Sequence, residues 1–197
     1  MSEDWDEFAA HWEQDEQPRI FRDEAFASLM AHGVLSDTAR VLDFGCGTGL
    51  LSEKLSPLVK EIIAVDTSRV MLDTLKAKAI TNVTALCADL DDPATRAGAA
   101  WLADLDLIVA SSVCGFLPDY EKTVQTLSAA LRPGGHFVQW DWLAADDDAE
   151  FGLPQARIGS ALEGAGLEDV TVRQVFSVTF DGEALPVLMG AGHVPSA

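Results

Sequence analysis

Three glycines in five residues are the most informative feature of this sequence. Gly45, Gly47 and Gly49 follow the apolar run 41–44, which predicts a short buried strand that turns sharply into a helix near Leu50. Glycine is needed where the backbone adopts positive φ angles or where a ligand approaches the main chain closely. The helix that follows directs free N–H groups and the positive end of its dipole over the loop. The loop is therefore expected to bind a ligand with anionic groups.

Two acidic residues downstream indicate which ligand this is. Asp66 ends the apolar run 61–66, about 20 residues beyond the glycines, where a carboxylate can accept hydrogen bonds from both hydroxyls of a ribose. Asp89 ends the run 83–89 and is suited to accept from an exocyclic amine. Leu50 stands where the dinucleotide fingerprint G-x-G-x-x-G needs its last glycine, which weakens a pyrophosphate-binding interpretation.

Asp43, the three glycines, Asp66 and Asp89 together resemble the class I S-adenosylmethionine-dependent methyltransferases. The resemblance implies that the loop holds the methionyl end of S-adenosyl-L-methionine, Asp66 the ribose and Asp89 the adenine amine. It extends to the segment after Asp66, where Met71 would pack on the adenine, and to residues 105–119 and 131–135. The cofactor-binding residues that it implies are Asp43, Gly45, Cys46, Gly47, Gly49, Leu50, Asp66, Thr67, Met71, Ala88, Asp89, Leu90, Ser111 and Phe116.

The residues of segment 110–116 help to exclude several classes of methyl acceptor. It lacks the Asn/Asp-Pro-Pro-aromatic sequence of amino-methylating DNA and RNA enzymes and the paired glutamates of protein arginine methyltransferases. Cys114 lacks the Pro-Cys context of the RNA cytosine-C5 enzymes, which argues against a nucleophilic role. What remains is a resemblance to the small-molecule group that includes ubiquinone-biosynthesis-like enzymes. It implies methyl transfer to an O, N or C atom of a small acceptor by in-line displacement, leaving S-adenosyl-L-homocysteine.

The acceptor is expected between the N-terminal helices and the loops after the fourth and fifth strands. Asp141 and His11 are the candidate general bases, and a base is needed only if the acceptor enters protonated. Phe8 and Trp140 fit ordinary core packing better than an acceptor pocket. No cluster of histidines or carboxylates has metal-ligand spacing, so no metal is expected. The candidate acceptor-binding residues are Trp12, Tyr120 and Trp142.

Strands and helices alternate from residue 40 onward, which predicts an α/β protein with a mostly parallel sheet. The family resemblance implies a Rossmann-like methyltransferase fold: a seven-stranded sheet in the order 3-2-1-4-5-7-6, an antiparallel C-terminal hairpin and helices on both faces. One domain is expected over residues 1–197, with a core over 38–197. Residues 1–35 are expected to form a helical cap over the active site. Expected strands are 40–44, 61–65, 83–87, 105–110, 136–142, 170–180 and 185–192; expected helices are two within 3–31, broken at 17–18, then 49–56, 68–78, 94–101, 120–131 and 154–164.

The 197 residues carry a formal net charge of −19, with 32 acidic and 13 basic residues. No Lys/Arg cluster is present to neutralise phosphates, which argues against a nucleic-acid partner. The acidity would attract a cationic substrate or the sulfonium of the cofactor, or it simply keeps the surface soluble. No apolar run approaches the roughly 18 residues of a membrane span, and the acidic N-terminus is unlike a secretory signal. A cytoplasmic protein is expected, and the sequence leaves its oligomeric state open.

Two alternatives remain open at this stage. One is an NAD(P)-binding oxidoreductase on a similar sheet, against which the missing last glycine and the C-terminal hairpin both count. The other is a non-catalytic protein that keeps the methyltransferase fold for binding or sensing.

Overall fold

The computed structural model describes residues 2–146, 151–180 and 182–196, without the side chains of residues 2–4, 10 and 11. The chain divides into two compact units, Met1–Trp101 and Leu102–Ala197. The single domain expected over 1–197 and its cap over 1–35 stay predictions. No helix of the described residues is long and apolar enough to cross a membrane.

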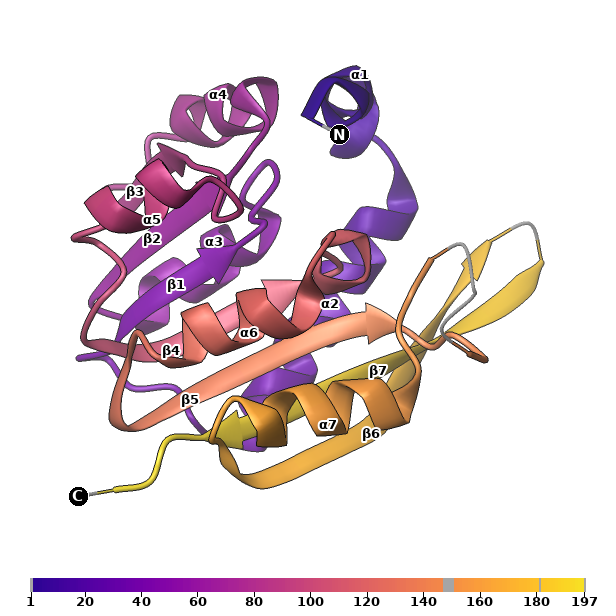
Figure 1. Cartoon of the computed structure of the whole chain (residues 1–197). Coiled ribbons are helices and arrows are strands. Elements are labelled where there is room, and N and C mark those ends of the chain that lie inside the picture. Colours follow the sequence, from indigo (N-terminus) through magenta and orange to yellow (C-terminus); the bar gives the residue numbers. More distant parts are fainter. Residues whose placement is uncertain (1, 147–150, 181, 197) are drawn as a thin grey trace. The chain divides into compact units, whose positions relative to one another are not determined.

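The first unit contains three parallel strands that pair in the order β3-β2-β1 (Figure 1). The strands β1 and β2 are almost wholly buried, which explains their continuous apolar runs, whereas β3 at the edge is partly exposed. Helix α4 packs against β2 and β3, and helix α1 contacts α4. The elements are α1 (Ser2–Trp12), α2 (Glu16–His32), β1 (Arg40–Phe44), α3 (Leu50–Leu55), η1 (Ser56–Leu58), β2 (Glu61–Asp66), α4 (Arg69–Ala77), β3 (Val83–Cys87) and α5 (Pro93–Gly98).

The second unit continues with β4 parallel to β5, while β7 pairs antiparallel with both β5 and β6 (Figure 1). The whole strand order is β3-β2-β1-β4-β5-β7-β6, which confirms the expected topology and the antiparallel C-terminal hairpin. Helix α7 packs against α6, β6 and β7. The elements are β4 (Leu105–Ser111), η2 (Cys114–Phe116), α6 (Tyr120–Ser128), β5 (Leu131–Trp142), α7 (Gln155–Gly164), β6 (Glu168–Phe180) and β7 (Glu183–His193).

Two proline-containing segments differ from the sequence-based expectation. The break between the N-terminal helices lies at residues 13–15, not at 17–18, and Pro18 falls within the first turn of α2. Proline is tolerated there because the first turn does not use its N–H group. The fifth strand begins at Leu131 instead of residue 136, because Leu131 already pairs with Leu105 before a register shift. The preceding helix accordingly ends at Ser128.

Trp140 is fully buried as expected, but Phe8 is 58% exposed, so its assignment to the core was wrong. Phe8 lies in α1, and the centroid of its ring is 5.9 Å from that of Trp5.

Candidate functional site

The loop between β1 and α3 has the backbone conformation that its glycines were expected to supply. Gly45, Gly47 and Gly49 all have positive φ angles, of 69°, 53° and 77°. A Cβ atom on Gly49 would lie 2.3 Å from Cδ1 of Leu75 in α4, so the close approach of these two segments requires glycine. A Cβ atom on Gly47 would instead lie 4.0 Å from both the Met71 sulfur and Nε1 of Trp12. The Gly47 backbone thus faces the Met71 sulfur and the Trp12 indole, and neither side chain fills the space beside it.

Asp66 ends β2 directly beside this loop. Its Oδ2 accepts a hydrogen bond from the Gly47 N–H at 2.8 Å, and its Oδ1 accepts from the Ser68 N–H at 2.8 Å. Burial raises the pKa of Asp66, while hydrogen bonds from Ser68, Gly47 and Thr67 oppose that shift and Asp6 adds to it. A carboxylate offers about four acceptor positions, so Asp66 can hold the loop and still accept from ligand hydroxyls.

Asp43 is buried beneath the same loop, with 1% of its surface exposed. Its Oδ2 accepts a hydrogen bond from the Ser52 hydroxyl of α3 at 2.6 Å. Burial raises the pKa of Asp43 to about 6, the Asp66 charge adds to this shift, and the Ser52 hydrogen bond opposes it. Asp43 therefore joins β1 to α3 and fixes the loop from below.

Thr48 is a residue of this loop that sequence reasoning missed. Its side chain is fully buried, and its Oγ1 has no hydrogen-bond partner among the described residues. A buried hydroxyl without a partner is costly and marks a position where a ligand or water can bind. Its place between two loop glycines was the available signal.

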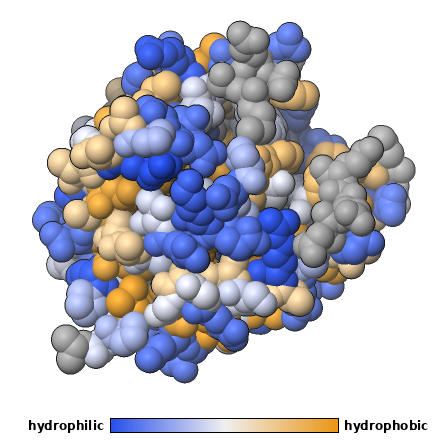
Figure 2. All heavy atoms as spheres, in the orientation of Figure 1, coloured by the Kyte–Doolittle hydropathy of each residue, from blue (hydrophilic) through white to orange (hydrophobic). Residues whose placement is uncertain are grey.

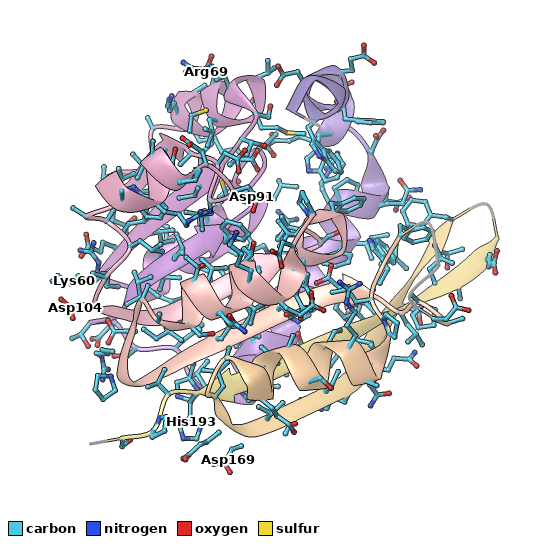
Figure 3. All side chains as sticks on the ribbon, in the orientation of Figure 1. Lys60, Arg69, Asp91, Asp104, Asp169 and His193 are labelled. Atoms are coloured by element: carbon cyan, nitrogen blue, oxygen red, sulfur yellow. The ribbon has the colours of Figure 1, made fainter. Side chains whose placement is uncertain are left out.

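The end of β3 lies next to Asp66, because the Ala88 N–H donates to the Asp66 carbonyl oxygen at 3.1 Å. The Asp89 carboxylate that follows is exposed and accepts from the Asp91 N–H at 2.8 Å; Figure 3 labels Asp91 in this loop. Leu90 is buried and Thr67 is exposed. The structure therefore brings Asp89 to the carboxyl ends of the same strands as Asp66, with its side chain accessible to solvent.

The second unit places Asp141 in a buried polar network at the end of β5. Asp141 Oδ1 accepts from the Gly115 N–H at 3.0 Å, and Oδ2 accepts from Gln139 Nε2 at 3.0 Å. The Tyr120 hydroxyl donates to Gln139 Oε1 at 2.7 Å, and the Cys114 thiol contacts Asp141. Burial raises the pKa of Asp141 to about 7, against the hydrogen bonds from Gly115, Gln139 and Cys114. This network holds η2 against β5.

Burial also raises the pKa of the Tyr120 hydroxyl and of the Cys114 thiol, with the Asp141 charge adding to both shifts. Tyr120 is fully buried, so its hydroxyl serves this network. The Cys46 thiol of the first unit is likewise buried with a raised pKa, for which Asp43 and Asp66 add to the effect of burial. These two thiols stay protonated and are poor nucleophiles.

Trp142 follows Asp141 and belongs to an aromatic cluster, which we define as Trp142, Phe151 and Phe180. Trp142 meets Phe151 and Phe180 edge to face, with ring centroids 6.4 and 5.5 Å apart. Its Nε1–H donates to the Ser112 hydroxyl at 3.0 Å, just beyond Ser111 at the end of β4. Phe151 and Phe180 are 44% and 38% exposed, so the cluster presents apolar ring surface to solvent.

The remaining predicted site residues are described by their element and their burial. Phe116 is 37% exposed in η2, Ser111 is half-buried, and Met71 is buried. His11 lies in α1, and its side chain is outside the described residues. Among the residues that the structure describes, no group of three or more His, Cys, Asp or Glu side chains could hold a metal ion.

The donors and acceptors of the first unit fit S-adenosyl-L-methionine. The Gly47 backbone leaves room that a side chain would fill, and the buried Thr48 hydroxyl lacks a partner among the described residues. Asp66 retains acceptor capacity for hydroxyls. These features can accommodate a ligand with ribose hydroxyls and a polar group beside the loop.

A methyltransferase domain matches residues 11–177 of the chain. The chain is 36% identical over 127 residues to a trans-aconitate 2-methyltransferase of Azoarcus sp., which covers 61% of this chain and 44% of that protein. It is 30% identical over 98 residues to a ubiquinone biosynthesis O-methyltransferase of Cupriavidus pinatubonensis, covering 49% and 39%. The chain thus spans less than half the length of these curated relatives.

The fold resembles that of the N-methyltransferase NodS of Bradyrhizobium japonicum in complex with S-adenosyl-L-homocysteine. The TM-score is 0.70 at 20% identity, and the match covers 94% of this chain and 92% of that structure. Sequence match, strand order and loop geometry agree. The chain belongs to the methyltransferase-domain family.

Proposed function

We propose that this protein transfers the methyl group of S-adenosyl-L-methionine to an O, N or C atom of a small acceptor by in-line displacement. The observation that carries the proposal is the joint geometry of the glycine loop and Asp66, which the Gly47 N–H ties together at 2.8 Å. The cofactor supplies an already activated methyl group, so alignment of the acceptor accounts for much of the acceleration.

Each part of the first unit has a proposed role. The loop 45–50 surrounds the methionyl end, with the Thr48 hydroxyl as an added hydrogen-bonding group. Asp66 accepts from the ribose hydroxyls, and the exposed Asp89 accepts from the adenine amine. Met71 packs on the adenine, with Ala88 and Leu90 beside it, while Asp43 supports the loop through Ser52. Ser111 and Phe116 stay predicted cofactor contacts from the second unit.

The aromatic cluster supports an acceptor with an apolar or aromatic body. Trp142 is held by its bond to Ser112 and by two edge-to-face rings, so its indole is pre-positioned for stacking. Trp12, whose Nε1 lies near Gly47, is the proposed acceptor residue of the first unit. Tyr120 is fully buried, so its proposed contribution to acceptor binding is indirect. Its hydroxyl donates a hydrogen bond to Gln139 and so holds the network beside Trp142 in place.

The charge of the protein favours a neutral or cationic acceptor. At −19 the chain repels a polycarboxylate such as trans-aconitate, the acceptor in one relative's name. His11 and Asp141 stay the proposed bases for a protonated acceptor. Asp141 is 1% exposed and both of its oxygens accept hydrogen bonds from Gly115 and Gln139, so any proton transfer to it runs through this network.

Calorimetric titration tests the proposal directly. S-adenosyl-L-methionine and S-adenosyl-L-homocysteine should both bind the purified protein in the micromolar range, and NADH should not. A methyl-transfer screen with neutral and cationic aromatic acceptors follows. Preference for NADH would favour the oxidoreductase instead, and binding of the cofactor without turnover on a broad panel would favour a sensor.

A further inference from the structure

Ser68 connects three parts of the first unit through hydrogen bonds. Its N–H donates to Asp66 Oδ1 at 2.8 Å, and its hydroxyl donates to Asp6 Oδ1 of helix α1. The same hydroxyl accepts from the Met71 N–H at 3.1 Å and so caps α4. Ser68 is fully buried, and Figure 3 labels its exposed neighbour Arg69 at the start of α4. One buried serine therefore joins α1 to the turn that orients Asp66.

Two further contacts hold the segment of α1 in the same place. The Trp12 indole Nε1 lies 4.0 Å from the position of a Cβ on Gly47. Just after α1, Glu13 pairs with Lys78 at 2.6 Å, and Lys78 also pairs with Glu53 of α3 at 3.0 Å. The segment 6–13 is thus attached to both ends of α4, through Ser68 and Lys78, and lies next to the glycine loop.

These contacts bring two carboxylates to one serine. Asp6 and Asp66 both accept hydrogen bonds from Ser68, so their carboxylates lie close together. The two carboxylates therefore repel each other, and Asp6 raises the pKa of Asp66. A ligand whose hydroxyls donate hydrogen bonds to Asp66 lowers the electrostatic cost of keeping Asp6 in place. By linkage, Asp6 in place then favours binding of that ligand.

We propose that Asp6 is a positioning residue of the cofactor site, which ties helix α1 to the turn that orients Asp66, so that cofactor binding and docking of α1 strengthen each other. This inference rests on the proposed function. The matched methyltransferase domain begins at residue 11, so Asp6 lies outside the matched region.

Hydrogen–deuterium exchange of the α1 backbone, with and without S-adenosyl-L-homocysteine, tests the coupling. In the wild-type protein the ligand should slow exchange over residues 5–12 severalfold, and Asp6→Ala should abolish that protection. The matched control is Glu7→Ala, which removes an exposed carboxylate from the next position on the same helix and should behave like wild type. Asp6→Asn keeps an acceptor for Ser68 and should restore part of the protection.

Calorimetry on the same variants distinguishes failure of the proposed role of Asp6 from failure of the proposed function. Asp6→Ala should bind S-adenosyl-L-homocysteine about tenfold more weakly, a typical coupling magnitude, and Glu7→Ala should bind it unchanged. Wild-type binding with equal ligand-induced protection in Asp6→Ala overturns this inference alone. Absence of any binding to the wild-type protein overturns the proposed function and this inference with it.

Discussion

Asp66 is the residue on which the proposed cofactor site depends most directly, because it serves both the loop and the ligand. Asp66→Ala removes an acceptor for ligand hydroxyls and releases the Gly47 and Ser68 N–H groups. Hydrogen bonds to a charged group contribute about 1.5 to 3 kcal/mol, so affinity for S-adenosyl-L-methionine should fall at least tenfold. Calorimetry measures this, with the exposed Asp37→Asn as control. Unchanged affinity in Asp66→Ala would remove its ribose role.

Asp141 should give the protein a characteristic dependence of stability on pH. Its folded pKa of about 7 lies above the unfolded value of about 3.9, so the folded state holds the proton more tightly. The stabilisation is complete below the unfolded pKa and is lost as pH rises through about 7. Between about pH 5.5 and pH 8, the advantage of wild type over Asp141→Asn should fall by about 2 kcal/mol.

Denaturant titrations of both proteins at several pH values measure this difference, since carboxylates shared by the two largely cancel. A constant difference across the range would show that Asp141 is ionised throughout in the folded state.

The sequence revealed acids at strand ends but could not reveal their partners. Asp66 was placed correctly at the end of its strand, because burial and chain order determine that position. The serines that bind these acids were missed as site residues: Ser52 under Asp43 and Ser68 beside Asp66 become neighbours only through packing. Thr48 was missed although it lies between two loop glycines, because its burial and its lack of a partner among the described residues arise only from packing.

At the level of the elements, the glycine loop approaches α4 closely at Gly49. Gly49→Ala combines a φ of +77° with a Cβ placed 2.3 Å from Leu75, so it should destabilise the protein beyond the strain of the backbone alone. Gly166→Ala is the matched control, with φ +80° and nothing within 4 Å of the added Cβ, and should cost only about 1 to 2 kcal/mol. Chemical denaturation compares the two, and equal losses would contradict the steric argument.

Element type followed from periodicity more reliably than element ends did. The parallel strands were predicted because they are buried on both faces and read as continuous apolar runs. Pro18 misled one boundary, because it was interpreted as a break between two helices while the structure accommodates it in α2. Pro18 fits a first helical turn, and Pro133 lies where β5 shifts register against β4.

For the whole molecule, charge is the property that should affect ligand binding at a distance. The chain carries −19, and Figure 2 shows hydrophilic residues over much of the face in view, with hydrophobic areas between them. S-adenosyl-L-methionine carries a sulfonium that S-adenosyl-L-homocysteine lacks, so added salt should weaken binding of the former more. Calorimetry at low and high ionic strength measures both, and equal salt slopes would leave the acidity as a matter of solubility.

The reaction of the cysteines with a thiol reagent can measure local opening of the protein. Cys46 lies in the glycine loop and Cys114 in η2, both buried, and each belongs to a different compact unit. A thiol reagent should therefore modify exposed Cys87 at once, and the other two only when their loops open. The labelling rates of Cys46 and Cys114 therefore report the opening of the first and of the second unit separately. A ligand that closes only one of the two loops should slow only the rate of the cysteine in that loop.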